Sequence, residues 1–156
     1  MAAHQITDKK LTLKEVEKII SQNLKLELSA AAIKRIQKCR QYLDDKVKNQ
    51  TTPIYGVTTG FGSLCNTSIS EKDLGKLQEN LMMSHACGMG EEVPEEVVKL
   101  MLLLKVQSLS YGNSGVQLET AQRLVDFFNE GIYPVVYEQG SLGASGDLVP
   151  LAHLCL

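Results

Sequence analysis

The sequence has no excess of basic residues. Its 16 lysine and arginine residues face 18 aspartate and glutamate residues, so the net charge is −2 at pH 7. Proteins that bind nucleic acid usually carry a basic face, and that function class is therefore disfavoured. None of the 4 cysteines forms a Cys-x-x-Cys pair. The spacing therefore favours neither a zinc site nor another metal site, and a disulfide framework is not expected.

Long hydrophobic runs are also missing. The densest apolar run, residues 100–104, is short and is flanked by Lys99 and Lys105, so no membrane span is expected. The N-terminus lacks the apolar core of a secretory signal, which favours a cytoplasmic location. The glycine-rich stretch 56–62 matches neither a Walker A loop nor a Rossmann fingerprint, so no nucleotide cofactor is predicted.

What the sequence does contain is helical periodicity. Apolar residues recur at helical spacing in several segments, and we predict a mainly α protein. The expected helices are 12–20, 29–48, 70–85, 94–111 and 116–130; a short strand is expected at 24–28, extended chain at 52–55 and 132–137, and a mobile tail at 1–11. The helix at 94–111 is apolar almost all round, which favours burial in a larger bundle or an oligomer. The apolar segment 150–156 leads us to expect a piece of a longer protein.

Two positions in the first 85 residues, Tyr55 and His85, are candidate site residues. Tyr55 directly precedes a loop with three glycines in seven residues, which predicts a backbone lying close to another group. Tyr55 is either a residue at the rim of a cavity or an ordinary aromatic strand residue. His85 ends a predicted helix and is either a ligand-contacting residue or a helix-terminal charge.

The third candidate is the tripeptide Ala144-Ser145-Gly146. If the Gly146 nitrogen attacks the Ala144 carbonyl carbon, a five-membered ring closes, and the Ser145 hydroxyl can leave as water to give a conjugated methylene. Gly146 has no Cβ and permits the backbone geometry that closure needs. The alternative is a flexible turn before a helix. Asp147 follows the tripeptide, either to orient backbone groups during closure or as a helix N-cap.

Three blocks in the same order resemble the aromatic amino acid ammonia-lyases: residues 55–62, residues 80–85 and residues 140–153. The resemblance runs from about Thr12 onward, corresponds to the N-terminal part of a much longer subunit, and is nearest to histidine ammonia-lyase. It implies an N-terminal helical region with short strands (residues 1–110). It also implies that residues 111–156 begin a central long-helix bundle of the ammonia-lyase type.

The resemblance also implies site roles. Ala144, Ser145 and Gly146 would form the electrophile 4-methylideneimidazol-5-one (MIO) autocatalytically, assisted by Asp147. Tyr55 would remove a β-proton of the substrate, His85 would contact the substrate side chain, and Gly62 would line the pocket. The product from histidine would be urocanate plus ammonia. A homotetramer is implied, with active sites drawn from several subunits, so the isolated piece is expected to be inactive.

Three alternatives remain open at this point. The break at 111–115 is closer to some tyrosine ammonia-lyases, and His85 can hydrogen-bond either an imidazole or a phenol. An aminomutase using the same electrophile is the second alternative. A non-catalytic helical oligomerisation module, with the tripeptide left uncyclised, is the third and belongs to a different class.

Overall fold

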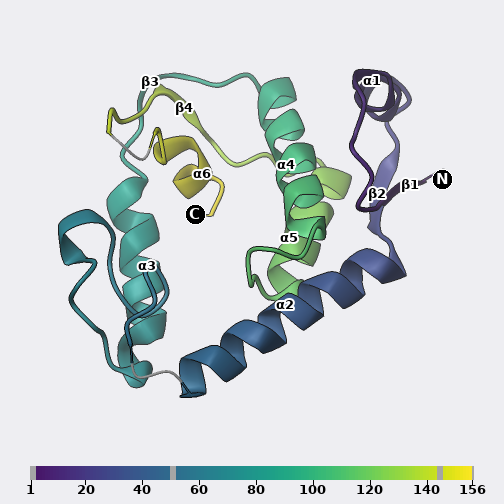
Figure 1. The fold of residues 1–156 in the computed structure, drawn as a ribbon. Coiled ribbons are helices and arrows are strands. Elements are labelled where there is room, and N and C mark those ends of the chain that lie inside the picture. The colour runs from purple at the N-terminus through teal and green to yellow at the C-terminus, as the bar shows by residue number, and fades with distance from the viewer. Residues whose placement is uncertain (1–2, 50–51, 144–145, 156) are drawn as a thin grey trace. The chain divides into compact units, whose positions relative to one another are not determined.

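A computed structural model describes residues 3–49, 52–143 and 146–155. Over these residues the chain is mainly α-helical, as predicted (Figure 1). Its elements are β1 (Ala3–Ile6), α1 (Leu13–Ser21), β2 (Lys25–Leu28), α2 (Ala30–Asn49), α3 (Leu74–His85), β3 (Met89–Glu92), α4 (Glu95–Ser110), α5 (Leu118–Glu130), β4 (Tyr137–Gln139) and α6 (Val149–His153). Two 3₁₀ turns, η1 (Gly62–Leu64) and η2 (Glu71–Asp73), precede α3.

The chain forms two compact units, each built from two separate stretches of sequence. Unit 1 contains Met1–Asp45 and Glu95–Tyr133, and unit 2 contains Lys46–Pro94 and Pro134–Leu156. These units are defined by contacts within the chain. The division expected at residue 110 refers to the parts of a longer subunit, and it stays a prediction.

The core of unit 1 joins a small sheet to two helices. β1 and β2 pair in parallel, with Ile6 opposite Leu28, and both side chains are buried. α4 packs on α5 and on β1, and α5 packs on β2. The helix predicted at 94–111 is confirmed as α4, which buries Val98, Leu102, Leu103, Val106 and Leu109. Burial of these side chains is the main stabilising contribution to the unit.

The prediction of a mobile tail over residues 1–11 is wrong for residues 3–11, and residues 1–2 lie outside the described residues. Residues 3–6 form β1, and Ile6 is fully buried. The backbone that follows is held by buried polar side chains of α4: the Gln107 amide donates to the Thr7 and Lys9 carbonyls, and the Ser110 hydroxyl donates to Thr7. A short parallel strand gives little local signal, because its partner is distant in sequence.

The helix boundaries of unit 1 follow the expected signals. Thr12 and Glu15 form a full capping box at the start of α1. Gly131 ends α5 in the left-handed conformation, at φ 69°. Asn129 joins the end of α5 to β2, accepting from the Leu26 N–H at 2.7 Å and donating to its carbonyl at 2.9 Å.

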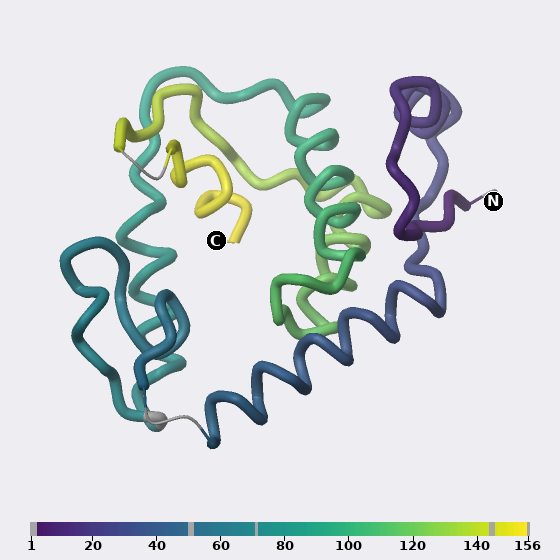
Figure 2. Tube along the Cα trace, viewed as in Figure 1, coloured from purple at the N-terminus to yellow at the C-terminus, as the bar shows by residue number. Residues whose placement is uncertain are grey.

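Unit 2 contains the segments that carry the predicted site. The predicted helix at 70–85 is present as η2 followed by α3, and Ser70 bonds the Asp73 carboxylate at 2.5 Å. β3 pairs antiparallel with β4, so the chain after α5 returns beside the segment that follows α3 (Figure 2). α6 packs against α3. The sequence predicted extended chain at 132–137, but the strand itself lies at Tyr137–Gln139.

Candidate functional site

The loop after Pro53 is folded by its own threonines and glycines. The Ile54 carbonyl accepts the Val57 and Thr58 N–H groups at 3.0 and 2.9 Å. Thr59 is fully buried, and its hydroxyl accepts from the Gly56 N–H at 3.2 Å. Gly56 has a positive φ of 69°, which L side chains rarely adopt. The ordered turn covers residues 55–58, so of the residues expected to be extended at 52–55 it takes in Tyr55.

This turn brings three predicted site residues into one cluster. The Tyr55 and Phe61 rings lie 5.7 Å apart between centroids, and the Phe61 and His85 rings lie 5.6 Å apart in a T-shaped arrangement. The Gly62 N–H donates to the Tyr55 phenol oxygen at 3.3 Å. Tyr55 is 59% exposed. We call Tyr55, Phe61, Gly62 and His85 the aromatic cluster.

The orientation of His85 is set by α3 itself. Its Nδ1 lies 2.7 Å from the Leu81 carbonyl oxygen, one turn earlier. A carbonyl only accepts, so Nδ1 carries the proton. In the neutral ring the lone pair is then on Nε2, which can accept a hydrogen bond from a donor. The Ser84 hydroxyl donates to the same carbonyl at 3.0 Å.

The second part of the candidate site is the loop between β4 and α6. Asp147 Oδ1 accepts from the Ser141 N–H at 3.0 Å and from the Val149 N–H at 3.1 Å. One carboxylate thus joins the two arms of the loop. The N-cap of α6 is Leu148, so Asp147 is not the helix N-cap considered from the sequence. A Cβ on Gly140 would overlap the Asp147 carboxylate, so the close approach needs glycine.

The electrophile precursor is only partly visible. Ala144 and Ser145 lie outside the described residues. Gly146 has a φ of 82°, and its N–H donates to the Gly143 carbonyl at 3.1 Å. Gly146 has no Cβ, so it takes this left-handed conformation without strain. Its nitrogen is the atom that ring closure would join to Ala144.

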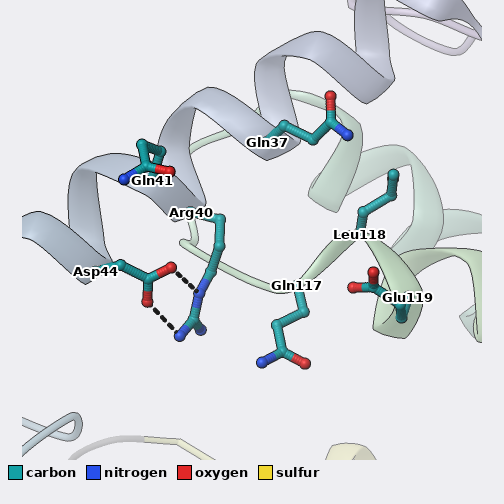
Figure 3. A pocket seen from close by; sticks show the side chains of 7 residues that line it. All are labelled: Gln37, Arg40, Gln41, Asp44, Gln117, Leu118 and Glu119. Atoms are coloured by element: carbon teal, nitrogen blue, oxygen red, sulfur yellow. Dashed lines mark hydrogen bonds and ion pairs between the residues drawn. The ribbon is translucent and has the colours of Figure 1, made fainter.

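A pocket of about 390 Å³ lies elsewhere, in unit 1, between α2 and the start of α5 (Figure 3). The Arg40 guanidinium there bonds both oxygens of Asp44, and it also donates to the Gly115 carbonyl at 3.3 Å. The cation is thus already paired, and none of the predicted site residues lines this pocket.

In residues 3–49, 52–143 and 146–155, no group of three or more His, Cys, Asp or Glu side chains could hold a metal ion. Within the same ranges, no helix is both long and apolar enough to cross a bilayer.

Comparison with known proteins decides the family. The family model for aromatic amino acid lyases matches residues 11–156, nearly the whole chain. The chain belongs to the aromatic amino acid lyase family. The mainly α architecture of the ammonia-lyase type, implied by the three sequence blocks, is thereby confirmed.

Individual relatives of the chain support the same family assignment. Histidine ammonia-lyase of Natranaerobius thermophilus is 46% identical over 151 residues, covering 97% of the chain and 30% of that protein. The crystal structure of histidine ammonia-lyase from Trypanosoma cruzi has a TM-score of 0.83 at 36% identity, covering 97% of the chain and 28% of that one. Tyrosine aminomutase from Streptomyces globisporus has a TM-score of 0.86 at 30% identity, with 98% and 28% covered. The chain thus spans about 30% of the length of the curated relative.

Sequence reasoning missed one member of the aromatic cluster. Phe61 lies within the glycine-rich block 55–62, and its ring contacts both Tyr55 and His85. Its position between two glycines of the loop was the available signal. Gln78 was also missed: its amide donates to the Gly56 and Val57 carbonyls at 3.3 and 3.4 Å, tying the loop to α3. No local pattern marks that contact.

Proposed function

We propose that the complete protein carrying this chain is an ammonia-lyase that converts L-histidine to urocanate and ammonia without oxidation. The observation that carries the proposal is the 46% identity to a histidine ammonia-lyase over 97% of the chain. The aromatic cluster and the Asp147-bridged loop support it, because the proposed base, substrate contact and electrophile precursor belong to one unit.

The cofactor in this proposal is MIO, formed from Ala144, Ser145 and Gly146. Once formed, the ring supplies an electrophile for the substrate amine. The described residues around it fit that role. Gly146 takes a left-handed conformation and donates its N–H to the Gly143 carbonyl, and Asp147 holds the two loop arms together. Neither a metal nor a nucleotide enters the proposal.

Tyr55 is the proposed base for the β-proton of the substrate. Its phenol oxygen accepts the Gly62 N–H, so a negative charge on that oxygen is stabilised by an oriented amide. Its ring packs against Phe61, which limits the positions that the oxygen can take. Gly62 contributes its amide to this arrangement and, in the proposal, lines the substrate pocket.

His85 is the proposed contact for the substrate side chain. With Nδ1 committed to Leu81, Nε2 of the neutral ring accepts the N–H of a substrate imidazole. A tyrosine phenol can also donate to it. The 30% identity to a tyrosine aminomutase structure therefore supports a second candidate, a tyrosine ammonia-lyase or aminomutase, less strongly than the first. The different-class alternative is a non-catalytic helical oligomerisation module.

The proposal extends to assembly and location. We place the complete protein as a homotetramer in the cytoplasm, with active sites shared between subunits and with residues 111–156 beginning the central bundle. Leu104 and Val97 of α4 are 54% and 42% exposed, which leaves apolar surface for further chain or a partner copy. The 156-residue piece alone is expected to be inactive.

The decisive experiment compares two variants of the complete protein. Ser145→Ala should abolish both turnover and the near-ultraviolet band of the ring. Tyr55→Phe should keep the band and lower turnover by about 10²–10⁴-fold, the usual contribution of a positioned base. An unchanged spectrum and rate in Ser145→Ala would favour the non-catalytic module.

Substrate choice is tested separately. The complete protein is incubated with histidine, tyrosine or phenylalanine, and product absorbance is followed. We expect the largest rate with histidine. Turnover of tyrosine but not histidine would transfer the proposal to the tyrosine enzymes, and conversion to a β-amino acid would indicate an aminomutase.

A further inference from the structure

A histidine outside the proposed chemistry connects two distant parts of unit 2. Nε2 of His153, at the end of α6, lies 3.0 Å from the backbone nitrogen of Gly88, 65 residues earlier. An amide N–H only donates, so Nε2 is the acceptor and carries a lone pair. In the neutral imidazole the proton is therefore on Nδ1.

The surroundings of Gly88 are built closely around this bond. A Cβ at Gly88 would lie 2.8 Å from His153 Nε2 and 3.1 Å from both Tyr137 Cβ and Val149 Cγ1. The Tyr137 and His153 rings meet in a T-shaped arrangement, with centroids 5.5 Å apart. Val149 is 1% exposed. Glycine is therefore the residue that lets the amide reach the imidazole without displacing its neighbours.

The bond between His153 and Gly88 anchors the helix that follows the tripeptide loop. The loop begins after Gln139, which pairs with Met89 in the β3–β4 ladder. It ends at α6, which His153 fastens to Gly88. The strand before the loop and the last residue of the helix after it are thus anchored on two consecutive residues, Met89 and Gly88. Asp147 joins the loop arms between them.

The same anchor lies close in sequence to the substrate contact. Gly88 follows His85 by three residues, and the Cys87 N–H donates to the His85 carbonyl at 2.9 Å. The backbone that leaves α3 is therefore a tight turn. His85 lies at the start of this turn, and Gly88, which donates to His153, directly follows it.

We propose that His153 is a positioning residue for the formation of the electrophile, holding the C-terminal arm of the tripeptide loop to the end of α3 through the Gly88 amide. This inference rests on the proposed function, since it concerns how Ala144, Ser145 and Gly146 reach the geometry for closure. Ring closure joins the Gly146 nitrogen to the Ala144 carbonyl carbon, and the carbonyl oxygen leaves as water with the Gly146 and Ser145 amide hydrogens. The Ser145 hydroxyl then leaves as a second water with the Ser145 α-hydrogen.

The test compares two substitutions in the complete protein. His153→Gln keeps an acceptor near the Nε2 position, whereas His153→Phe keeps a ring and removes the acceptor. His4→Phe, in unit 1, is the matched histidine control. Each protein is made in a cell-free system. The fraction of chains that have lost the mass of two waters from the tripeptide peptide is followed over time, together with the near-ultraviolet band.

We expect ring formation in His153→Phe to be slower by about three- to tenfold, the factor that one net hydrogen bond contributes to a rate. His153→Gln and His4→Phe should form the ring within about twofold of the parent rate. Parent-like ring formation in His153→Phe, or equal slowing in the Gln variant, would overturn the role of the acceptor.

Two further measurements keep the outcomes distinct. If His153→Phe does not fold, ¹⁵N NMR of the folded parent should show an unprotonated Nε2 on His153; a protonated Nε2 would overturn the inference. A parent protein that never loses two waters overturns the proposed function. A parent that loses them, beside an unaffected His153→Phe, overturns only the positioning role.

Discussion

Substitution of Gly56 tests whether the aromatic cluster must be built as described. A Cβ at Gly56 would lie 2.7 Å from Cε1 of Phe61, and the backbone φ there is 69°. Phe61 cannot turn away freely, because its ring packs against both the Tyr55 and the His85 rings. Gly56→Ala therefore forces either the loop or the Phe61 ring to move.

The size of the effect follows from two contributions. A left-handed conformation costs an L residue about 1–2 kcal/mol. Overpacking by one methyl group typically costs about 1–3 kcal/mol. A loop that relaxes to avoid this cost displaces Tyr55, which directly precedes Gly56, and a displacement of about 1 Å can lower a rate by about 10²-fold. We expect turnover to fall by at least about tenfold, with the ring band retained.

Gly75→Ala is the matched control. Gly75 lies in the first turn of α3, and a Cβ there would have no heavy atom within 4 Å. Alanine in a helix is favoured over glycine by about 0.5–1 kcal/mol, so this variant should be slightly more stable and fully active. Turnover is measured by urocanate absorbance and stability by denaturant unfolding. Gly56→Ala with turnover within twofold of Gly75→Ala would refute the reasoning.

Three further predictions concern other contacts. Asn129→Ala removes both hydrogen bonds to the Leu26 backbone and should lower the free energy of unfolding by about 1–3 kcal/mol in denaturant titrations; an unchanged midpoint would contradict it. Asp147→Ala frees the loop arms and should slow appearance of the ring band, whereas parent-like appearance would count against the bridge. The pKa of His4 is lowered from 6.5, mainly by burial, with Glu15 opposing and Lys18 reinforcing the shift. Its stabilising contribution is complete above about pH 6.5 and is lost as the pH falls through the lowered folded pKa; His4→Gln should flatten that part of a stability–pH curve, and an identical curve would exclude the assignment.

The helices could be predicted because their signals are local. The capping box at Thr12 and the glycine at 131 mark ends that the structure reproduces. The β1 strand could not be predicted, because its stability comes from pairing with β2 and from α4 side chains 100 or so residues away. β3 was missed for a related reason: all four of its residues are exposed, so no alternation marks it.

In the candidate site, too, residues with local sequence signals could be predicted and contacts between distant segments could not. Tyr55 and His85 were found because glycine blocks and a helix end lie beside them in the sequence. That Phe61 contacts both, and that Gly88 bonds His153, depends on contacts between separated segments. The roles of Tyr55, Gly62, His85 and Asp147 stay predictions, whereas the family and its helical architecture are confirmed.

The interleaving of the two units has a consequence for synthesis on the ribosome. Unit 1 combines Met1–Asp45 with Glu95–Tyr133, so its strands and α2 leave the ribosome long before the helices that cover them. At about 5–20 residues per second, the 88 residues from Lys46 to Tyr133 take about 4–18 s to make. During that interval Ile6, Leu26 and Leu28 lack the cover of α4 and α5 and are open to chaperones or to aggregation. A pause in translation before residue 95 would lengthen this exposure, and one after residue 133 would not.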